Sequence, residues 1–180
     1  MAHYCDIAPY DPLHASYHDT EYGFPSREER VLFERMVMEI MQAGLSWGTI
    51  LKKRSALNHA FEGYDVDKIA AYGAKDKMRL LGDASIIRNR LKIEAVIYNA
   101  GQVQALRQTH GSFAAWLDSY HPRNKDEWVK LMKQNFRFMG PEIVGEFLMS
   151  LGYLSGSHKA SCPVYEKIIK IMKKGGKRGV

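Results

Sequence analysis

Signals that begin and end helices recur at short intervals along this chain, and they limit its fold more than any other feature. The clearest example is the run VLFERMVMEIMQAG (31–44), in which apolar residues repeat at helical spacing. A capping box of Ser26 and Glu29 precedes this run, and Gly44 is placed to end it. No stretch alternates between apolar and polar residues with the period of two that a half-buried strand requires. We therefore predict an all-α fold.

The same signals divide the rest of the chain into helices. Ser46, Asp65 and Ser112 are predicted N-caps, and Pro141 suits the first position of a helix. Residues 16–23, SYHDTEYG, are expected to belong to an N-terminal loop. The helices predicted after the first cover residues 47–54, 56–61, 66–72, 75–81, 85–108, 113–120, 125–134, 141–151 and 163–174.

The length and composition fit one domain with a basic extension. The chain has 180 residues and is 46% hydrophobic, which is enough for a packed core. We expect residues 1–162 to form the domain, and residues 163–180 to form a basic amphipathic helix and tail whose end, 173–180, frays. The segment 163–180 carries +5 of the net charge of +6. That charge fits a nucleic-acid contact and equally fits a solvated tail.

Composition also argues against several classes of protein. No apolar run is long enough to cross a membrane, and the start, MAHYCDIAPYDP, lacks the apolar segment of a secretory signal. Two cysteines are too few for a disulfide scaffold. We therefore expect a cytoplasmic protein without a membrane partner.

The two cysteines and two of the histidines suggest a metal site. His158 and Cys162 are four residues apart, which would place them on one face of a helical turn, and Cys5 with His18 supplies a second pair. Four such ligands suit tetrahedral zinc and leave no open position, so the ion would be structural and would join the two ends of the domain. Ordinary buried thiols and surface histidines explain the spacing as well. A catalytic cysteine is less favoured, because neither cysteine lies in an elbow-like sequence context.

One acidic residue and a group of aromatic rings suggest a binding pocket. Glu39 lies on the apolar stripe of helix 31–44, where a carboxylate is costly unless it is paired or solvated at the edge of the stripe. Rings beside a lone carboxylate suit a planar, electron-poor guest such as a nucleic-acid base, although ordinary core aromatics explain them too. The rings in question are Tyr4, Tyr10, Tyr17, Tyr22 and Trp47.

The helices predicted at 125–134 and 141–151 are joined by a tight turn at Gly140. The backbone N–H groups that open the second helix could receive a DNA phosphate. A plain hairpin of two helices is the alternative.

Several segments, taken together, resemble the bacterial 3-methyladenine DNA glycosylase I family. They occur in the family's order and cover most of residues 5–162; QAGLSW with the following TILKKR, and the run IIRNRLKI, are the most specific. The segments are YHDTEYG (17–23), EIMQAGLSWGTILKKR (39–54), IIRNRLKIEAVIYNA (86–100), FRFMG (136–140) and HKASC (158–162).

The resemblance implies a single helix-hairpin-helix glycosylase domain that excises alkylated bases from double-stranded DNA as a monomer. It implies a structural zinc held by Cys5, His18, His158 and Cys162. Glu39 would contact the polar edge of the methylated base, and Tyr17, Trp47 and Tyr22 would line its pocket. Gly44 and Leu45 would enter the duplex, with Gly140 at the DNA-binding hairpin.

The chain also departs from the family pattern. Ile7 stands where an aromatic residue is expected, Tyr22 replaces the tryptophan of the pattern HDxEWG, and the basic helix after Cys162 is additional. Pro141 and Glu142 occupy the place where lyase-type relatives carry a lysine, so hydrolysis without strand cleavage is expected. Two alternatives stay open: a zinc-stabilised DNA-binding paralogue with weak, altered or no activity, and a metal-dependent hydrolase, which a closed four-ligand site disfavours.

Overall fold

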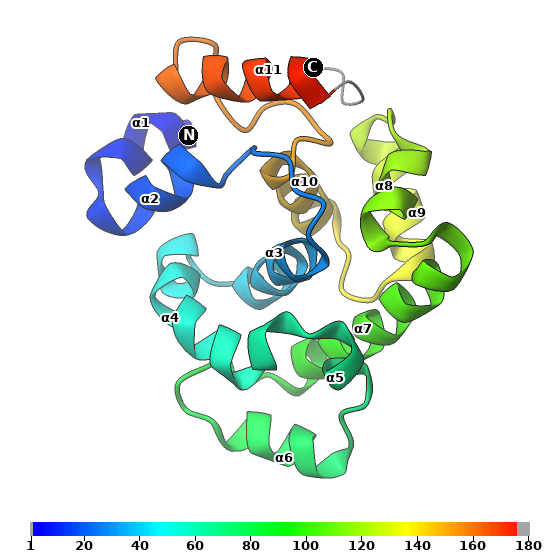
Figure 1. Cartoon of the computed structure of the whole chain (residues 1–180). Coiled ribbons are helices and arrows are strands. Elements are labelled where there is room, and N and C mark those ends of the chain that lie inside the picture. The colour runs from blue at the N-terminus through cyan, green and yellow to red at the C-terminus, as the bar shows by residue number, and fades with distance from the viewer. Residues whose placement is uncertain (1, 176–180) are drawn as a thin grey trace.

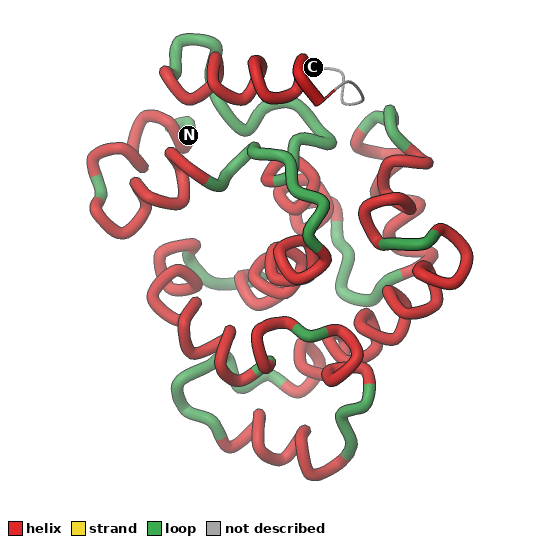
Figure 2. Tube along the Cα trace, in the orientation of Figure 1, coloured by secondary structure: helices red, strands yellow, loops and turns green. Residues whose placement is uncertain are grey.

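A computed structural model describes residues 2–175, and this part of the chain consists of helices joined by loops, with no strand (Figure 2). The α-helices are α1 (Tyr4–Ile7), α2 (Pro12–Thr20), α3 (Glu29–Gln42), α4 (Trp47–Ala60), α5 (Val66–Ala70), α6 (Ala74–Gly82), α7 (Arg90–His110), α8 (Phe113–Tyr120), α9 (Lys125–Asn135), α10 (Pro141–Ser150) and α11 (Pro163–Gly175), with short 3₁₀ turns at Ala8–Tyr10 and Glu62–Tyr64. The predicted all-α class is confirmed.

Helix α3 lies at the centre of the molecule, and the other helices are arranged around it (Figure 1). It packs against α4, α7, α8 and α10. Nine of its residues are buried, among them apolar side chains from Leu32 to Met41 and the polar Arg35 and Glu39. The helix is therefore enclosed on most sides, and any polar group that it carries inward lies in the interior of the protein.

Three predicted helix boundaries are wrong. Helix α3 begins at Glu29 with Glu28 as its N-cap, because the Ser26 hydroxyl accepts a hydrogen bond from the Glu28 N–H and forms a local turn instead of a capping box. The two helices predicted at 47–54 and 56–61 are one helix, α4. The predicted helix 85–108 begins only at Arg90, where Asn89 caps it.

The predictions of an N-terminal loop at residues 16–23 and of a helical turn at His158 are also wrong. Residues 12–20 form α2, because the Asp11 side chain accepts a hydrogen bond from the Leu13 N–H and Pro12 occupies the first helical position. His158 and Cys162 lie in the irregular segment between α10 and α11. Their spacing of four therefore reflects a loop and not a helix face.

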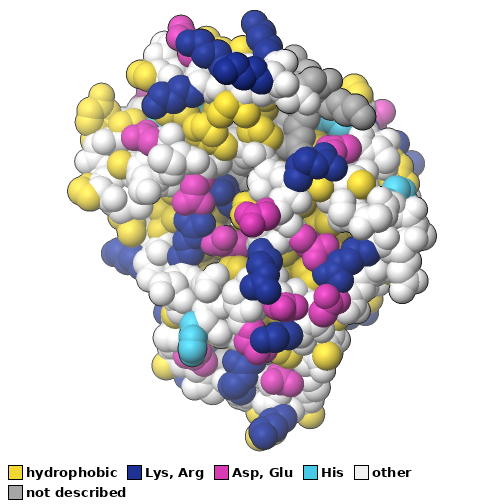
Figure 3. All heavy atoms as spheres, viewed as in Figure 1, with side chains coloured by type: hydrophobic (Ala, Val, Ile, Leu, Met, Phe, Trp, Pro, Cys, Tyr) yellow, Lys and Arg dark blue, Asp and Glu magenta, His cyan; other side chains and the backbone are white. Residues whose placement is uncertain are grey.

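Helix α11 is amphipathic, as predicted, and covers the N-terminal end of the chain. Val164 and Ile168 are buried and pack with Cys162, Cys5 and Phe24. The lysines of α11 are exposed, and Figure 3 shows basic side chains along the outer edge of this helix above a hydrophobic patch. The predicted fraying at 173–180 falls mainly outside the described residues.

No helix within residues 2–175 combines the length and the apolar character needed to cross a bilayer.

Candidate functional site: an acidic aromatic pocket beside a Cys/His cluster

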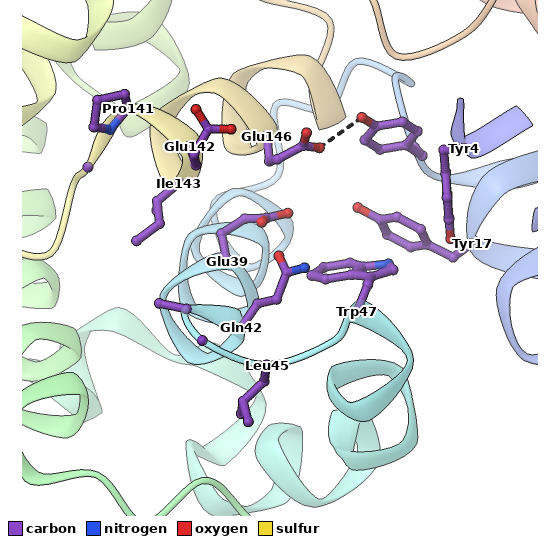
Figure 4. A pocket seen from close by; sticks show the side chains of 14 residues that line it. Tyr4, Tyr17, Glu39, Gln42, Leu45, Trp47, Pro141, Glu142, Ile143 and Glu146 are labelled. Carbon is purple, nitrogen blue, oxygen red and sulfur yellow. Dashed lines mark hydrogen bonds between the residues drawn. The ribbon is translucent and has the colours of Figure 1, made fainter. Parts of the chain in front are cut away.

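A cavity of about 650 Å³ opens between the N-terminal helices, the C-terminal end of α3 and the N-terminal end of α10 (Figure 4). It brings together every residue that the sequence assigned to base or DNA binding. Its lining consists of Tyr4, Tyr17, Tyr22, Glu39, Gln42, Ala43, Gly44, Leu45, Trp47, Gly140, Pro141, Glu142, Ile143 and Glu146.

Glu39 extends into this cavity from the last turns of α3 and is only 4% exposed. No described residue forms a hydrogen bond with its carboxylate. Burial raises the pKa of Glu39 well above its usual range, the Glu146 carboxylate raises it further, and Arg35 offsets these effects only in part. The prediction that Glu39 is a buried acid is correct, whereas the alternatives of a solvated stripe edge and of a direct arginine pair do not describe this residue.

Tyr17 and Trp47 form one aromatic wall of the cavity, with their ring centroids 5.2 Å apart. The Tyr17 hydroxyl accepts a hydrogen bond of 3.1 Å from Arg35, whose guanidinium also pairs with Glu21 at 2.9 Å. Arg54 donates two further bonds to Glu21, each of 2.7 Å. This network fixes the Tyr17 ring and pairs both arginines with Glu21, which is not part of the lining.

Tyr22 lies next to this wall and is 7% exposed. Its hydroxyl donates a hydrogen bond of 2.9 Å to Glu146 of α10. Tyr4 packs edge-on against Tyr22, with ring centroids 5.4 Å apart. Ile7, the other departure from the family pattern, is 54% exposed and is not part of the lining.

Sequence reasoning assigned no specific role in base binding to several lining residues, chiefly Tyr4, Gln42 and Glu146. Tyr4 was noted only for its ring, although its position beside Cys5 would place it near the cavity if the Cys/His cluster formed. Glu142 and Glu146 are four residues apart in the helix that begins after Gly140, a spacing that puts both carboxylates on one face. That spacing was the available signal for Glu146.

The loop between α3 and α4 forms the rim of the cavity. Gly44 has φ +80°, a left-handed conformation that favours glycine, and the next residue, Leu45, is 42% exposed. Lys92 of α7 fixes this loop. It is 5% exposed and donates hydrogen bonds to the carbonyls of Met41 at 2.9 Å and Ala43 at 2.6 Å. Gly140 lies across the cavity as the N-cap of α10.

The ligand atoms of Cys5, His18, His158 and Cys162 lie within 4.8 Å of one another. The His158 Nδ1 is 3.5 Å from the Cys5 Sγ and 3.6 Å from the Cys162 Sγ, and the His18 Nε2 is 3.9 Å from the Cys162 Sγ. Zinc bonds of about 2.3 Å to sulfur and about 2.0 Å to nitrogen would separate tetrahedral ligands by about 3.5 Å. The cluster therefore has the donor set of a four-coordinate metal site, and its three shortest printed separations, 3.5, 3.6 and 3.9 Å, are close to this value.

The remaining ring nitrogens of both histidines are also held. His158 Nε2 lies 2.7 Å from the carbonyl of Tyr22, and His18 Nδ1 lies 2.7 Å from a carboxylate oxygen of Asp19. Such partners orient the imidazoles of metal sites and set which nitrogen faces the ion. The bond to the Tyr22 backbone also connects the cluster directly to the wall of the cavity.

Known proteins resemble this chain over most of its length. The family described as methyladenine glycosylase matches residues 7–130. DNA-3-methyladenine glycosylase 1 of Escherichia coli is 34% identical, over 89% of this chain and 96% of that protein.

Two solved structures extend the comparison to the fold. The structure of 3-methyladenine DNA glycosylase I from Staphylococcus aureus superposes with a TM-score of 0.80 at 33% identity, covering 89% of this chain and 95% of that one. A tyrosine-to-phenylalanine variant of 3-methyladenine DNA glycosylase I in complex with 3-methyladenine gives a TM-score of 0.81 at 31% identity, covering 89% and 96%. The matches in sequence and in fold agree, and this chain belongs to the methyladenine glycosylase family.

Proposed function

We propose that this chain is a DNA glycosylase that hydrolyses the N-glycosidic bond of 3-methyladenine in alkylated double-stranded DNA. The observation that carries the proposal is a buried carboxylate, Glu39, that forms no hydrogen bond with any residue of 2–175 and faces aromatic rings in a cavity of about 650 Å³. The relatives named DNA-3-methyladenine glycosylase, and the solved complex with 3-methyladenine, support the same activity. The chain would then act in base-excision repair.

The lesion carries a formal positive charge, and its glycosidic bond is already weakened. The protein therefore has to extract the nucleotide from the duplex and hold the cationic base, while a strong general acid is not needed. Glu39 would accept hydrogen bonds from the base and stabilise its charge, and Tyr17, Tyr22 and Trp47 would add cation–π attraction. The base leaves with the electrons of the broken bond, and water then adds to the sugar carbon.

The residues that follow Gly140 support hydrolysis without strand cleavage. A Schiff base to the sugar requires an amine, and Pro141 and Glu142 offer none at this rim. The same turn, with α9 and α10 on either side, would serve as the helix-hairpin-helix element that receives DNA phosphates. Gly44 and Leu45 would enter the base stack from the opposite rim, because an exposed leucine at a loop tip can replace an extracted base.

The Cys/His cluster would hold a structural zinc ion. Four protein ligands close the coordination sphere, so the metal would stabilise the fold and take no part in bond cleavage. Residues 1–162 would form the glycosylase domain, with 163–180 as an appended basic segment, and we expect the protein to act as a monomer. A metal-dependent hydrolase is disfavoured, because it needs an open coordination position.

The main alternative is a DNA-binding paralogue without activity, which the substitution at Tyr22 keeps open. One assay separates the two: methylated duplex DNA is incubated with the protein, and free 3-methyladenine is quantified. We expect release by the wild type and at least a hundredfold slower release by Glu39→Gln, corresponding to about 2.7 kcal/mol of transition-state stabilisation.

The matched control is Glu166→Gln, the same chemical change on an exposed residue of α11, which should leave release unchanged. DNA binding is measured for all three proteins. Equal, background release by the wild type and Glu39→Gln, with binding intact, would assign the chain to the paralogue.

A further inference from the structure

A second acid faces the same cavity as Glu39. Glu146 of α10 lines the cavity together with Glu39, and its carboxylate accepts the hydrogen bond of 2.9 Å from Tyr22 that Figure 4 marks with a dashed line. The two residues of this hydrogen bond are 124 positions apart in the sequence. We propose that Glu146 is a specificity-determining residue of the pocket, which together with Glu39 selects purines that carry a formal positive charge.

The hydrogen bond fixes the position of this acid. Tyr22 is 7% exposed, and its hydroxyl has a single hydrogen, which it donates to one oxygen of Glu146. The tyrosine that replaces the tryptophan of the family pattern is thus a positioning residue for an acid on another helix.

Neither carboxylate has a cation of its own. No described Lys, Arg or His forms an ion pair with Glu39 or Glu146. Arg35, whose charge partly offsets the effect of burial on Glu39, is bonded to Tyr17 and Glu21. Glu142, the third acid of the lining, pairs with Lys125 at 3.4 Å. Glu39 and Glu146 are therefore the acids of the cavity whose mutual repulsion a cationic guest would relieve.

This arrangement separates charged from neutral guests. A neutral adenine could offer its amino group to Glu39 but would leave the repulsion between the two acids in place. A base alkylated at N3 and still attached to a carbon at N9 carries a full positive charge, which attracts both the buried carboxylate of Glu39 and the half-buried carboxylate of Glu146. This inference rests on the proposed function and adds a second acid to the pocket that recognises the charged lesion.

The test compares two ligands that differ in charge. The 3,9-dimethyladeninium ion mimics the alkylated base in its glycosidic state, and 9-methyladenine is its neutral counterpart; binding of each is followed by the fluorescence of Trp47 and by calorimetry. Glu146→Gln removes the charge and keeps an oxygen that can accept from Tyr22. We expect it to weaken binding of the cation about tenfold, as one charge-assisted contact would, and to change binding of the neutral ligand less than about twofold.

A second variant tests the positioning role of the tyrosine. Tyr22→Phe keeps the ring and releases Glu146, so the ratio of the affinity for the cation to the affinity for the neutral ligand should fall. Tyr22→Phe and Glu146→Gln should both keep the wild-type melting temperature within a few degrees. Glu166→Gln is again the control for a lost carboxylate and should keep the wild-type ratio.

The outcomes separate the inference from the proposed function. Equal losses for both ligands in Glu146→Gln, or no loss for either, would overturn the role of Glu146 even if the wild type releases 3-methyladenine from DNA. A second outcome combines a selective loss of cation binding in Glu146→Gln with a wild type that releases no 3-methyladenine. That outcome would support the role of Glu146 and reject the proposed activity.

Discussion

Glu39 combines an acidic side chain with almost complete burial. Its pKa depends first on this burial and then on two other charged residues. Burial and the Glu146 carboxylate raise its pKa, and Arg35 lowers it only in part. Folding therefore favours the protonated form of Glu39 and makes its ionised form costly. The acid that suits a cationic guest is thus a source of instability in the empty pocket, a common relation between stability and function.

This relation predicts how stability depends on pH. Between the ordinary glutamate value of 4.5 and the raised pKa of Glu39, the native state binds more protons than the unfolded state, so the free energy of unfolding falls as pH rises. Glu39→Gln has no carboxyl group at this position, so it lacks this pH-dependent change in the free energy of unfolding. We expect the variant to be more stable than the wild type at neutral pH, with a difference that shrinks as pH falls towards 4.5.

Urea unfolding at several pH values measures this difference. Glu166→Gln, whose carboxylate is exposed, should differ from the wild type by the same small amount at every pH. A constant difference for Glu39→Gln as well would mean that the pKa of Glu39 is not raised by folding.

At the scale of elements, the C-terminal end of α3 determines both the depth and the rim of the pocket. Lys92, from the run IIRNRLKI, places its ammonium group on the carbonyls of Met41 and Ala43, which have no partner within the helix. A positive charge is also favoured at the C-terminal end of the helix dipole. Lys92 therefore links the motif in α7 to the position of the Gly44–Leu45 loop.

Removing that ammonium group should affect both stability and activity on DNA. Lys92→Met keeps the length of the side chain but leaves the carbonyls of Met41 and Ala43 unpaired, so we expect a loss of about 2–3 kcal/mol in the free energy of unfolding. Release of 3-methyladenine from duplex DNA should fall because the loop carrying Leu45 is no longer fixed.

The matched control is Lys52→Met, the same change at an exposed position of α4. Its stability should remain within about 0.5 kcal/mol of the wild type. If Lys92→Met unfolds at the same urea concentration as Lys52→Met, Lys92 does not stabilise the end of α3.

At the scale of the whole molecule, the Cys/His cluster connects the two ends of the domain. Cys5 and His18 come from the N-terminal helices, and His158 and Cys162 from the segment before α11. Val164 and Ile168 of α11 pack over the same region. The cluster also borders the pocket, since His158 bonds to the backbone carbonyl of Tyr22.

Metal analysis of the purified protein should find about one zinc ion per chain. Its removal by a chelator should lower the free energy of unfolding by about 4–5 kcal/mol, the chain-closure value for so long a loop. Cys162→Ser should reproduce the loss, and addition of zinc should restore only the wild type. A metal-free wild type with unchanged stability would refute the structural role.

The local part of this fold could be read from the sequence, because helix caps and apolar periodicity act within about four residues of one another. Ser46, Asp65 and Ser112 are the N-caps that were predicted. The missed helix α2 had a readable signal as well, in Asp11 followed by Pro12. The wrong start of α7 shows the limit of periodicity, since Ile86 is buried through tertiary packing and not as part of a helix face.

The amino-acid sequence is enough to predict the helical class, the family and the set of Cys, His, Glu and aromatic residues from which the site is built. The folded structure adds that Tyr22 holds Glu146 in the pocket of Glu39, and that Arg35 pairs with Glu21. The difference arises from distance along the chain. A cap or a stripe is encoded by neighbours, whereas the charge and pKa of a buried acid depend on side chains that only the packing of α2, α3 and α10 brings within reach.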